Sequence, residues 1–321
     1  MVKLNDRLLR VTSSEGWGRD MPTHVLGDWL NRFPTLATHA TRLRCEGAST
    51  LPGKRPDWLT CMDDMRYVGH EPDGDAMLLH FRAPNLGDAA PELFRQQSLF
   101  DLYPPAEFTS LDILAETLGD VERENADSDR LDKPLLNRIS KLRSCFIDGF
   151  KSVQFTDSIA HQRATNLTID VLDTAERWTS TPPKEQEARL VGTLDTVVWS
   201  SRGFVLVTSE GNRVRGVLTE GDQTLLKEWL GKPVLVHGRA VFRPSGSLLR
   251  IEARQIETRM DAPPIFSRLP KPVFGLRPKT QTMLKPVVKD GRQVSAFGAT
   301  FGILKDALST EELRAMLVEL R

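Results

Sequence analysis

The sequence predicts an α+β protein in three parts: a mixed α/β N-terminal domain (residues 1–180), a small five-stranded β-barrel (residues 188–259) and a C-terminal arm (residues 260–321) with a short helix. Three observations predict this organisation. Apolar residues recur at helical spacing in the first half, and five strand-like segments follow in the second half. After Met260, prolines and basic residues become frequent, which is typical of an extended arm.

Length and composition are those of an ordinary globular protein. With 321 residues the chain is long enough for two domains, and it is 40% hydrophobic and 27% charged, so it can bury a sizeable core. No window approaches the roughly 20 apolar residues of a membrane span, and residues 1–10 are too charged for a signal peptide. We therefore expect a cytoplasmic protein that makes no membrane contact.

The sequence offers little for metal or cofactor chemistry. Its cysteines, Cys45, Cys61 and Cys145, lack the paired spacing of zinc and redox sites, so we expect buried thiols, no metal and no cofactor. It has no glycine-rich phosphate loop, no dinucleotide-binding glycine fingerprint and no serine elbow. We therefore assign no catalytic residue and favour a protein that is not an enzyme.

The first predicted helix is expected to end at Pro34, because proline disfavours a helical conformation in the residue before it. Its apolar face consists of Val25, Leu26, Trp29, Leu30 and Phe33. Farther along, Met65–Val68 and Ala76–Phe81 flank the segment Glu71–Asp75. The proline and glycine in that segment suit a tight reversal, so we predict a β-hairpin.

Two further helices are predicted to pack together. Thr109 and Asp112 can cap the start of the first, and the second follows Asp132-Lys133-Pro134 and is expected to end at Gly149. Their apolar faces are Leu111, Leu114, Leu118 and Val121 in the first, and Leu135, Leu136, Ile139, Leu142 and Phe146 in the second.

Short strands and a linker are predicted to close the domain. Val153–Phe155 and the alternating Leu167, Ile169 and Val171 are typical of strands. Two prolines within Ser180–Lys184 favour a linker, and we place the domain boundary there.

Two polar clusters in this half suggest metal or catalytic sites at first sight. The segment Asn125–Asp132 begins like a calcium loop, but Arg130 and Leu136 stand where such a loop needs glycine and glutamate. We therefore expect Asp129 or Asp132 to cap a helix. The second cluster surrounds the predicted hairpin and is interpreted as a polar turn, because no carboxylate-x-lysine pattern follows it. It comprises His70, Glu71, Asp73, Asp75 and His80.

The barrel is predicted from five strands in the order βββαββ. The strands are Ala188–Trp199, Phe204–Thr208, Arg213–Thr219, Val234–Phe242 and Leu248–Ile256, and Leu225, Leu226, Trp229 and Leu230 mark the helix. The segments 210–212 and 244–246 carry turn residues and are expected to form hairpins. Small residues at Gly192, Gly216 and Gly238 fit strands that coil sharply enough to close a barrel.

Alternation in the fourth strand predicts an apolar interior and a basic exterior. Val234, Val236, Gly238, Ala240 and Phe242 share one face, while His237, Arg239 and Arg243 share the other.

This strand order, the helix after the third strand and the segments Gly216–Leu218 and Val234–Gly238 resemble the oligonucleotide/oligosaccharide-binding (OB) fold. The resemblance covers about 70 of the 321 residues, and an SH3-like barrel is the competing interpretation. In the OB fold, ligands lie across strands two and three and between the first and last hairpin loops, where arginine meets phosphate and aromatic rings stack on bases.

The resemblance makes single-stranded nucleic acid the favoured ligand class. The candidate binding residues are Trp199, Arg202, Arg213, Arg215, His237, Arg239 and Arg243, and Arg250 and Arg254 are also expected to face outward. The alternative is a basic face that is solvated or binds protein. In that case its charge is balanced by Glu210, Glu220, Glu252 and Glu257.

The arm ends in a predicted amphipathic helix. Ser309–Glu312 form a capping box, and an apolar face follows. The segments Phe301–Asp306 and Thr310–Leu313 resemble the tail by which antitoxins contact PIN-domain ribonuclease toxins, over about 20 residues. The resemblance implies that a toxin or another protein partner docks on Phe301, Leu313, Met316, Leu317 and Leu320. Alternatively, the helix packs on its own domain.

Taken alone, the sequence therefore favours a non-enzymatic, two-domain binding protein whose barrel recognises single-stranded nucleic acid. The first alternative is a protein that docks a partner through its arm. The second is a metal-dependent enzyme with its site in the N-terminal domain.

Overall fold

The computed structural model describes residues 3–13, 16–17, 20–51, 54–94, 103–147, 149–155, 164–180, 183–198, 202–258, 268–272, 287–289 and 292–294. The chain divides into two compact units, Met1–Val273 and Phe274–Arg321. In the second unit, β11 (Val287–Lys289) pairs antiparallel with β12 (Arg292–Val294). Trp199 and all five residues predicted to dock a partner, from Phe301 to Leu320, lie outside the described residues.

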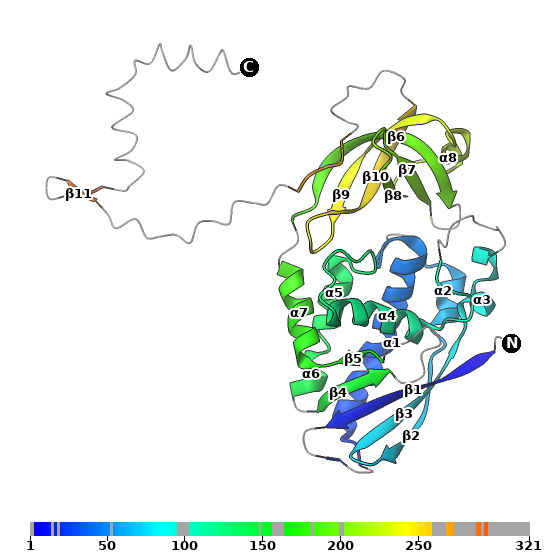
Figure 1. The fold of residues 1–321 in the computed structure, drawn as a ribbon, viewed down its shortest axis with the longest axis vertical. Helices are drawn as coiled ribbons and strands as arrows, with labels where there is room; N and C mark the ends of the chain where they lie inside the picture. Colours follow the sequence, from blue (N-terminus) through cyan, green and yellow to red (C-terminus); the bar gives the residue numbers. More distant parts are fainter. Residues whose placement is uncertain are drawn as a thin grey trace. The chain divides into compact units, whose positions relative to one another are not determined.

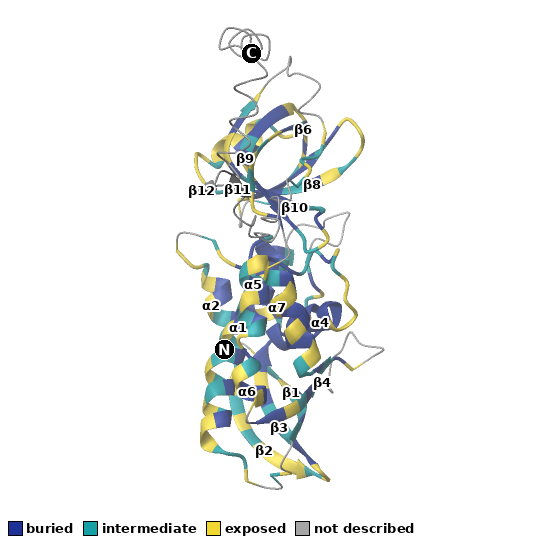
Figure 2. Ribbon diagram, turned by 90° about the vertical axis from the view of Figure 1, so that its left-hand side faces the viewer, coloured by how far each residue is buried: buried dark blue, intermediate teal, exposed yellow. Residues whose placement is uncertain are grey.

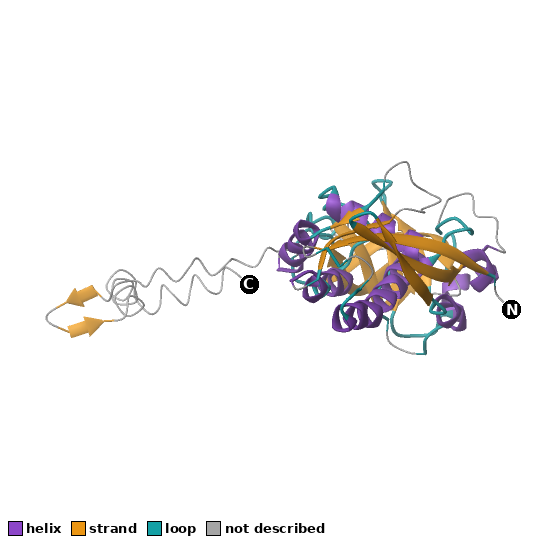
Figure 3. Ribbon diagram, turned by 90° about the horizontal axis from the view of Figure 1, so that it is seen from below, coloured by secondary structure: helices purple, strands orange, loops and turns teal. Residues whose placement is uncertain are grey.

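The first unit contains a mixed α+β domain, as predicted, built on a five-stranded antiparallel sheet (Figure 3). The strand order is β2-β3-β1-β4-β5. The strands are β1 (Leu4–Ser13), β2 (Arg66–Asp73), β3 (Ala76–Pro84), β4 (Phe150–Phe155) and β5 (Asn166–Leu167). The predicted β-hairpin is confirmed, with its reversal at Gly74, where φ is +63°.

Seven helices and one short 3-10 turn among the described residues complete this domain (Figure 1). The helices are α1 (Thr23–Glu46), α2 (Asp57–Met62), α3 (Leu86–Ala89), α4 (Ser110–Glu122), α5 (Lys133–Ser140), α6 (Arg143–Ile147) and α7 (Ile169–Ser180), and the 3-10 turn is Pro91–Phe94. Their apolar faces share one hydrophobic core with the sheet. None of the described helices is long and apolar enough to cross a membrane.

Helix α1 does not end at Pro34, as the sequence predicted, but continues for three more turns to Glu46. A proline inside a helix removes one backbone hydrogen bond and costs about 3 kcal/mol. Here the apolar face extends past the proline, because Phe33 before it and Leu36 and Leu43 after it are all buried. Burial of each such side chain contributes about 1.5–3 kcal/mol, so the continued helix is favoured.

Two other boundaries also differ from the prediction. The helix expected to run as far as Phe146 is divided into α5 and α6. Of the residues predicted as a strand near the end of the domain, Leu167 lies in β5, but Ile169 and Val171 belong to α7. Three alternating apolar residues fit a strand, but the buried Leu172 and Ala175 that follow continue a helical spacing.

The predicted β-barrel is confirmed, and Figure 2 shows it as a closed ring of strands. Its five strands close in the order β10-β8-β7-β6-β9. They are β6 (Gln186–Val198), β7 (Gly203–Val207), β8 (Arg213–Leu218), β9 (Pro233–Phe242) and β10 (Leu248–Thr258), with α8 (Thr224–Glu228) between β8 and β9. β8 and β10 pair in parallel, and the other neighbours pair antiparallel.

Two of the predicted small residues are required by close approaches in the barrel. A Cβ atom at Gly216 would overlap the ring of Phe204, which is buried in the barrel core. A Cβ atom at Gly238 would overlap the backbone of β10 at Glu252. The buried apolar residues of the barrel form a hydrophobic core of their own, separate from that of the α+β domain.

Candidate functional site

The outer face of β7 and β8, where the resemblance predicts a ligand, packs against the α+β domain. Val205 and Val217 are absent from the barrel core but are only 7% and 4% exposed. Val217 lies next to Gly47, the residue that caps the end of α1: a Cβ atom at Gly47 would be 3.6 Å from Val217 Cγ2. The centre of the predicted ligand face is therefore covered by protein.

A second contact comes from residues 125–132, which join α4 to α5 and are called the acidic loop here. Its Asp127 accepts hydrogen bonds from Ser245 and Ser247 in the β9–β10 turn, the first at 2.7 Å. Asp129 lies 3.3 Å from Arg215 on β8, and Asp132 lies 3.3 Å from Arg250 on β10. All three carboxylates of the loop therefore bind the barrel.

Part of the structure of this loop agrees with the prediction from the sequence. The prediction of a helix cap is confirmed for Asp132, whose carboxylate accepts a 3.1 Å bond from the backbone N–H of Leu135 in α5. The same carboxylate also accepts bonds from the N–H and hydroxyl of Ser49 at 3.0 and 2.6 Å. The docking of the loop on the barrel was not predicted, because its partners are distant in sequence.

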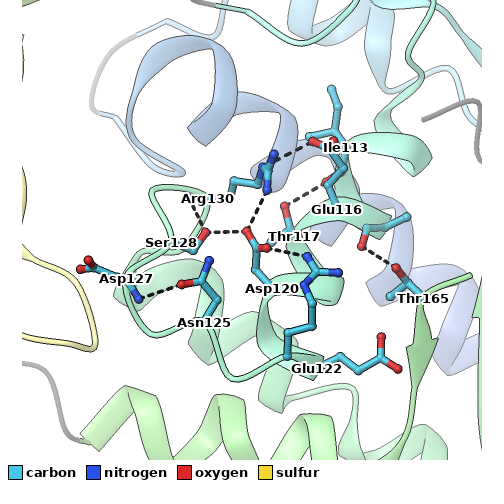
Figure 4. Close-up of polar contacts among 12 residues, drawn as sticks. Ile113, Glu116, Thr117, Asp120, Glu122, Asn125, Asp127, Ser128, Arg130 and Thr165 are labelled. Carbon is cyan, nitrogen blue, oxygen red and sulfur yellow. Dashed lines mark hydrogen bonds and ion pairs between the residues drawn. The ribbon is translucent and has the colours of Figure 1, made fainter. Parts of the chain in front are cut away.

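Internal contacts hold the acidic loop in shape. Figure 4 shows Ser128 and Arg130 directed at the carboxylate of Asp120 on α4, at 2.6 and 3.0 Å. Arg123 binds the other oxygen of Asp120 at 2.7 Å. Burial alone would raise the pKa of Asp120, but these three donors outweigh it and lower that pKa below its ordinary value. The loop is thus ordered by an ionised, nearly buried aspartate.

A row of alternating charges leads from the domain contact to the barrel surface. Arg250, bound to Asp132, is 2.9 Å from Glu252, which is 2.7 Å from Arg239, which in turn is 2.9 Å from Glu185. Burial opposes the ionisation of Glu252, but Arg250 and Arg239 overcome this effect and lower its pKa. The prediction that Arg250 faces solvent is wrong: it is 3% exposed, because Asp132 covers it.

The predicted nucleic-acid-binding residues do not form one patch. Arg213 and Arg215 lie on β8, whereas His237 and Arg239 lie on β9, and β10 separates the two strands. Arg243 follows β9.

Most of these side chains have a partner within the protein. Arg213 pairs with Asp195 at 2.7 Å, and Arg202 donates to the side chain of Gln223 at 3.3 Å. Arg243 donates to Ser247 at 3.1 Å.

A pocket remains between the last turn of α1 and strands β7 and β8. Its apolar wall includes Phe204 and Val217, and Tyr103 also lines it. The charged lining residues are Arg44, Glu46, Arg215 and Arg250. Arg44 was not predicted to belong to a site, because in the sequence it looks like an ordinary residue of an amphipathic helix.

Arg44 is the unusual residue of this pocket. Its Nε atom is buried and has no hydrogen-bond partner, and no ion pair to Arg44 is formed within the described residues. Burial lowers the pKa of its guanidinium, while Asp129 and Glu116 act in the opposite direction from a distance. Asp129 binds Arg215, and Glu116 lies 3.4 Å from Arg130. The two carboxylates that raise the pKa of Arg44 are therefore each paired with another arginine.

The hairpin cluster is held by ion pairs: Glu71 lies 3.3 Å from His80, and Arg10 bridges Asp73 and Asp75. Within the described ranges, no group of three or more histidine, cysteine or acidic residues is placed to hold a metal.

The cysteines are free, and Cys45 and Cys145 are buried as predicted, whereas Cys61 is half-buried. Burial raises the pKa of Cys145 to about 12, so this thiol is a poor nucleophile at neutral pH.

Comparisons with known proteins gave no match: neither a protein-family model, nor a curated protein, nor a solved structure matches this chain.

Proposed function

We propose that this is a non-enzymatic binding protein whose barrel, of the OB type, takes single-stranded nucleic acid at the arginines of β8. The strand order, the parallel pair β8–β10 and the helix between β8 and β9 support the OB assignment. The observation that carries the proposal is the position of Arg213 and Arg215 on the third strand of the barrel, one of the two strands that bind ligands in this fold.

The ion pairs of these arginines are of the kind that a phosphate can replace. The side chains of Arg213 and Arg215 are 43% and 38% exposed, and their partners Asp195 and Asp129 are similarly exposed. Exposed ion pairs contribute about 0–1 kcal/mol. A charge-assisted contact to phosphate is stronger, and it also releases counterions from the nucleic acid.

The covered face restricts how a strand can lie. Because Val217 lies beside Gly47 at the end of α1 and Val205 is also buried, bases cannot stack across the middle of β7 and β8 in this arrangement. A strand would instead contact the end of β8 at Arg213, whose side chain is 43% exposed, and Asp129 would compete with it for Arg215. We therefore expect modest, salt-sensitive affinity.

Fluorescence anisotropy with labelled single-stranded DNA and RNA, at about 50 and about 200 mM salt, tests this proposal. We expect binding that weakens with salt, with a slope of log affinity against log salt reduced by about 1–2 in R213A/R215A, since each lost phosphate contact removes about 0.7–0.9. The matched control is R66A/R82A, which removes two arginines from exposed pairs on the other domain. An absence of binding at low salt would refute the proposal.

A second function is favoured by a different observation: the barrel presents apolar groups that suit a protein partner. Around α8, Leu225 and Leu230 are 36% and 51% exposed, beside the partly buried Trp229. Recognition of a partner through this side or through the C-terminal arm is therefore the alternative. Co-purification of one protein with the full chain, and its loss in L225S/L230S or after truncation of the arm, would favour it.

A further inference from the structure

We propose that the pocket between the end of α1 and strands β7–β8 binds one phosphate group through Arg44 and Arg215. The phosphate can be the terminal phosphate of a nucleic-acid strand or a free phosphate. Only the strand-end source rests on the function proposed above.

The first argument is the state of Arg44. Arg44 is half-buried, and its buried Nε has no hydrogen-bond partner among the described residues. This is unfavourable, because burial of the N–H removes water without supplying a replacement acceptor. The pKa of Arg44 is lowered, and burial is the largest cause. The lowered pKa thus also indicates that the charged guanidinium is under-compensated. An anion in the pocket would supply both the missing acceptor and the missing charge.

The second argument is the charge of the lining. Of the residues that the structure describes, three arginines but a single carboxylate, that of Glu46, line the pocket. Glu46 is itself bound by Arg42 at 2.6 Å, and Arg250 is held by Asp132 and Glu252. Arg44 and Arg215 are therefore the two lining cations best able to turn toward a ligand, since the pair of Arg215 with Asp129 is half-exposed.

The third argument is size and shape. The pocket has a volume of about 50 Å³. A cavity needs about 10–15 Å³ on this measure to hold one water, so it accommodates on the order of four water-sized groups. This matches the size of one phosphate group, and the rest of a nucleotide would lie outside the pocket. Guanidinium forks bind phosphate oxygens in pairs, which lysine cannot do.

A purely structural role for Arg44 is the competing explanation. It stands in the last turn of α1, where the helix dipole favours a positive charge. The two explanations predict different stabilities for R44Q. A structural role predicts that R44Q is less stable in every buffer, whereas a phosphate site predicts that R44Q is at least as stable as wild type until phosphate is added.

The experiment uses the full-length protein in two arms. In the first, thermal unfolding is followed with inorganic phosphate or with sodium chloride at equal ionic strength. In the second, anisotropy compares one single-stranded oligonucleotide with and without a 5′-phosphate, and with and without a 3′-phosphate. The variants are R44Q, R44K and R215Q, and the control is R32Q, which removes an arginine from an exposed pair on the same helix.

We expect phosphate to raise the unfolding temperature of wild type and R32Q but not of R44Q, with an intermediate effect in R44K. A terminal phosphate that tightens oligonucleotide binding about tenfold in wild type, and not in R44Q, supports the site and identifies a strand end. Stabilisation by inorganic phosphate without any preference for a phosphorylated end supports the site and identifies free phosphate.

Two outcomes would overturn the phosphate site, and a third would separate it from the proposed function. The proposal fails if phosphate stabilises R44Q as much as wild type, or if neither phosphate source has an effect. If phosphate stabilises wild type but no oligonucleotide binds at low salt, the proposed nucleic-acid function fails and the phosphate site stands.

Discussion

The contact between Asp132 and the barrel allows a quantitative prediction. Removing the carboxylate in D132A eliminates the cap of α5, which costs about 1 kcal/mol, and one partner of a buried ion pair, which costs about 3–5 kcal/mol. Glu252 stays 2.9 Å from Arg250 and compensates part of its charge. We therefore expect a total loss near the lower limit, about 3 kcal/mol.

Chemical denaturation followed by tryptophan fluorescence measures this loss. The control is D6A, because Asp6 pairs with Arg82 at the surface and such pairs contribute at most about 1 kcal/mol. A double-mutant cycle of D132A with R250A should give a coupling energy of about 1–3 kcal/mol, since the two residues share one network. A loss in D132A no larger than that in D6A, or additive effects in the cycle, would refute the account of the contact between domain and barrel.

Three further predictions concern single residues. Asp120 has a lowered pKa, so its stabilising contribution is complete above its ordinary pKa of 3.8 and disappears as the pH falls through the pKa of the folded state. The difference in unfolding temperature between wild type and D120N should therefore shrink between pH 7 and pH 3. A constant difference would contradict this. In the barrel, G216A should destabilise the protein by about 1–3 kcal/mol, because its methyl group meets the ring of Phe204. The double variant G216A/F204L should recover part of that loss. Equal losses in the single and double variants would count against the steric explanation. In α1, P34A restores a backbone donor and should raise stability by about 1–3 kcal/mol in urea unfolding; a less stable P34A would show that the proline is needed where it stands.

The barrel is the part of the fold that sequence patterns specify most directly. Its strands alternate inward and outward residues, its turns carry glycine or proline, and Gly216 and Gly238 stand where other chain segments come close. These are local properties, and each strand pairs with its neighbours through them. The predicted strands and the helix α8 therefore agree with the structure to within a few residues.

In the α+β domain, long-range packing overrides two predictions made from local sequence patterns. The rule that proline ends a helix failed at Pro34, because the core accepts Leu36 and Leu43 on the same face beyond it. The alternation of Leu167, Ile169 and Val171 fits a strand, but burial along α7 decides for a helix. Period and propensity describe a segment by itself, whereas the hydrophobic core selects among the conformations that the segment allows.

The sequence by itself thus determined the α+β class, the barrel and the identity of its arginines. Only the tertiary structure decided which of these arginines are accessible to a ligand and which are already paired. Arg250 is buried by a residue 118 positions away, and the acidic loop occupies Arg215 through Asp129. Arg44, unremarkable in the sequence, lies half-buried in a pocket beside β8. The physical reason is that charge pairing and desolvation depend on distances in space, and a one-dimensional pattern does not contain them.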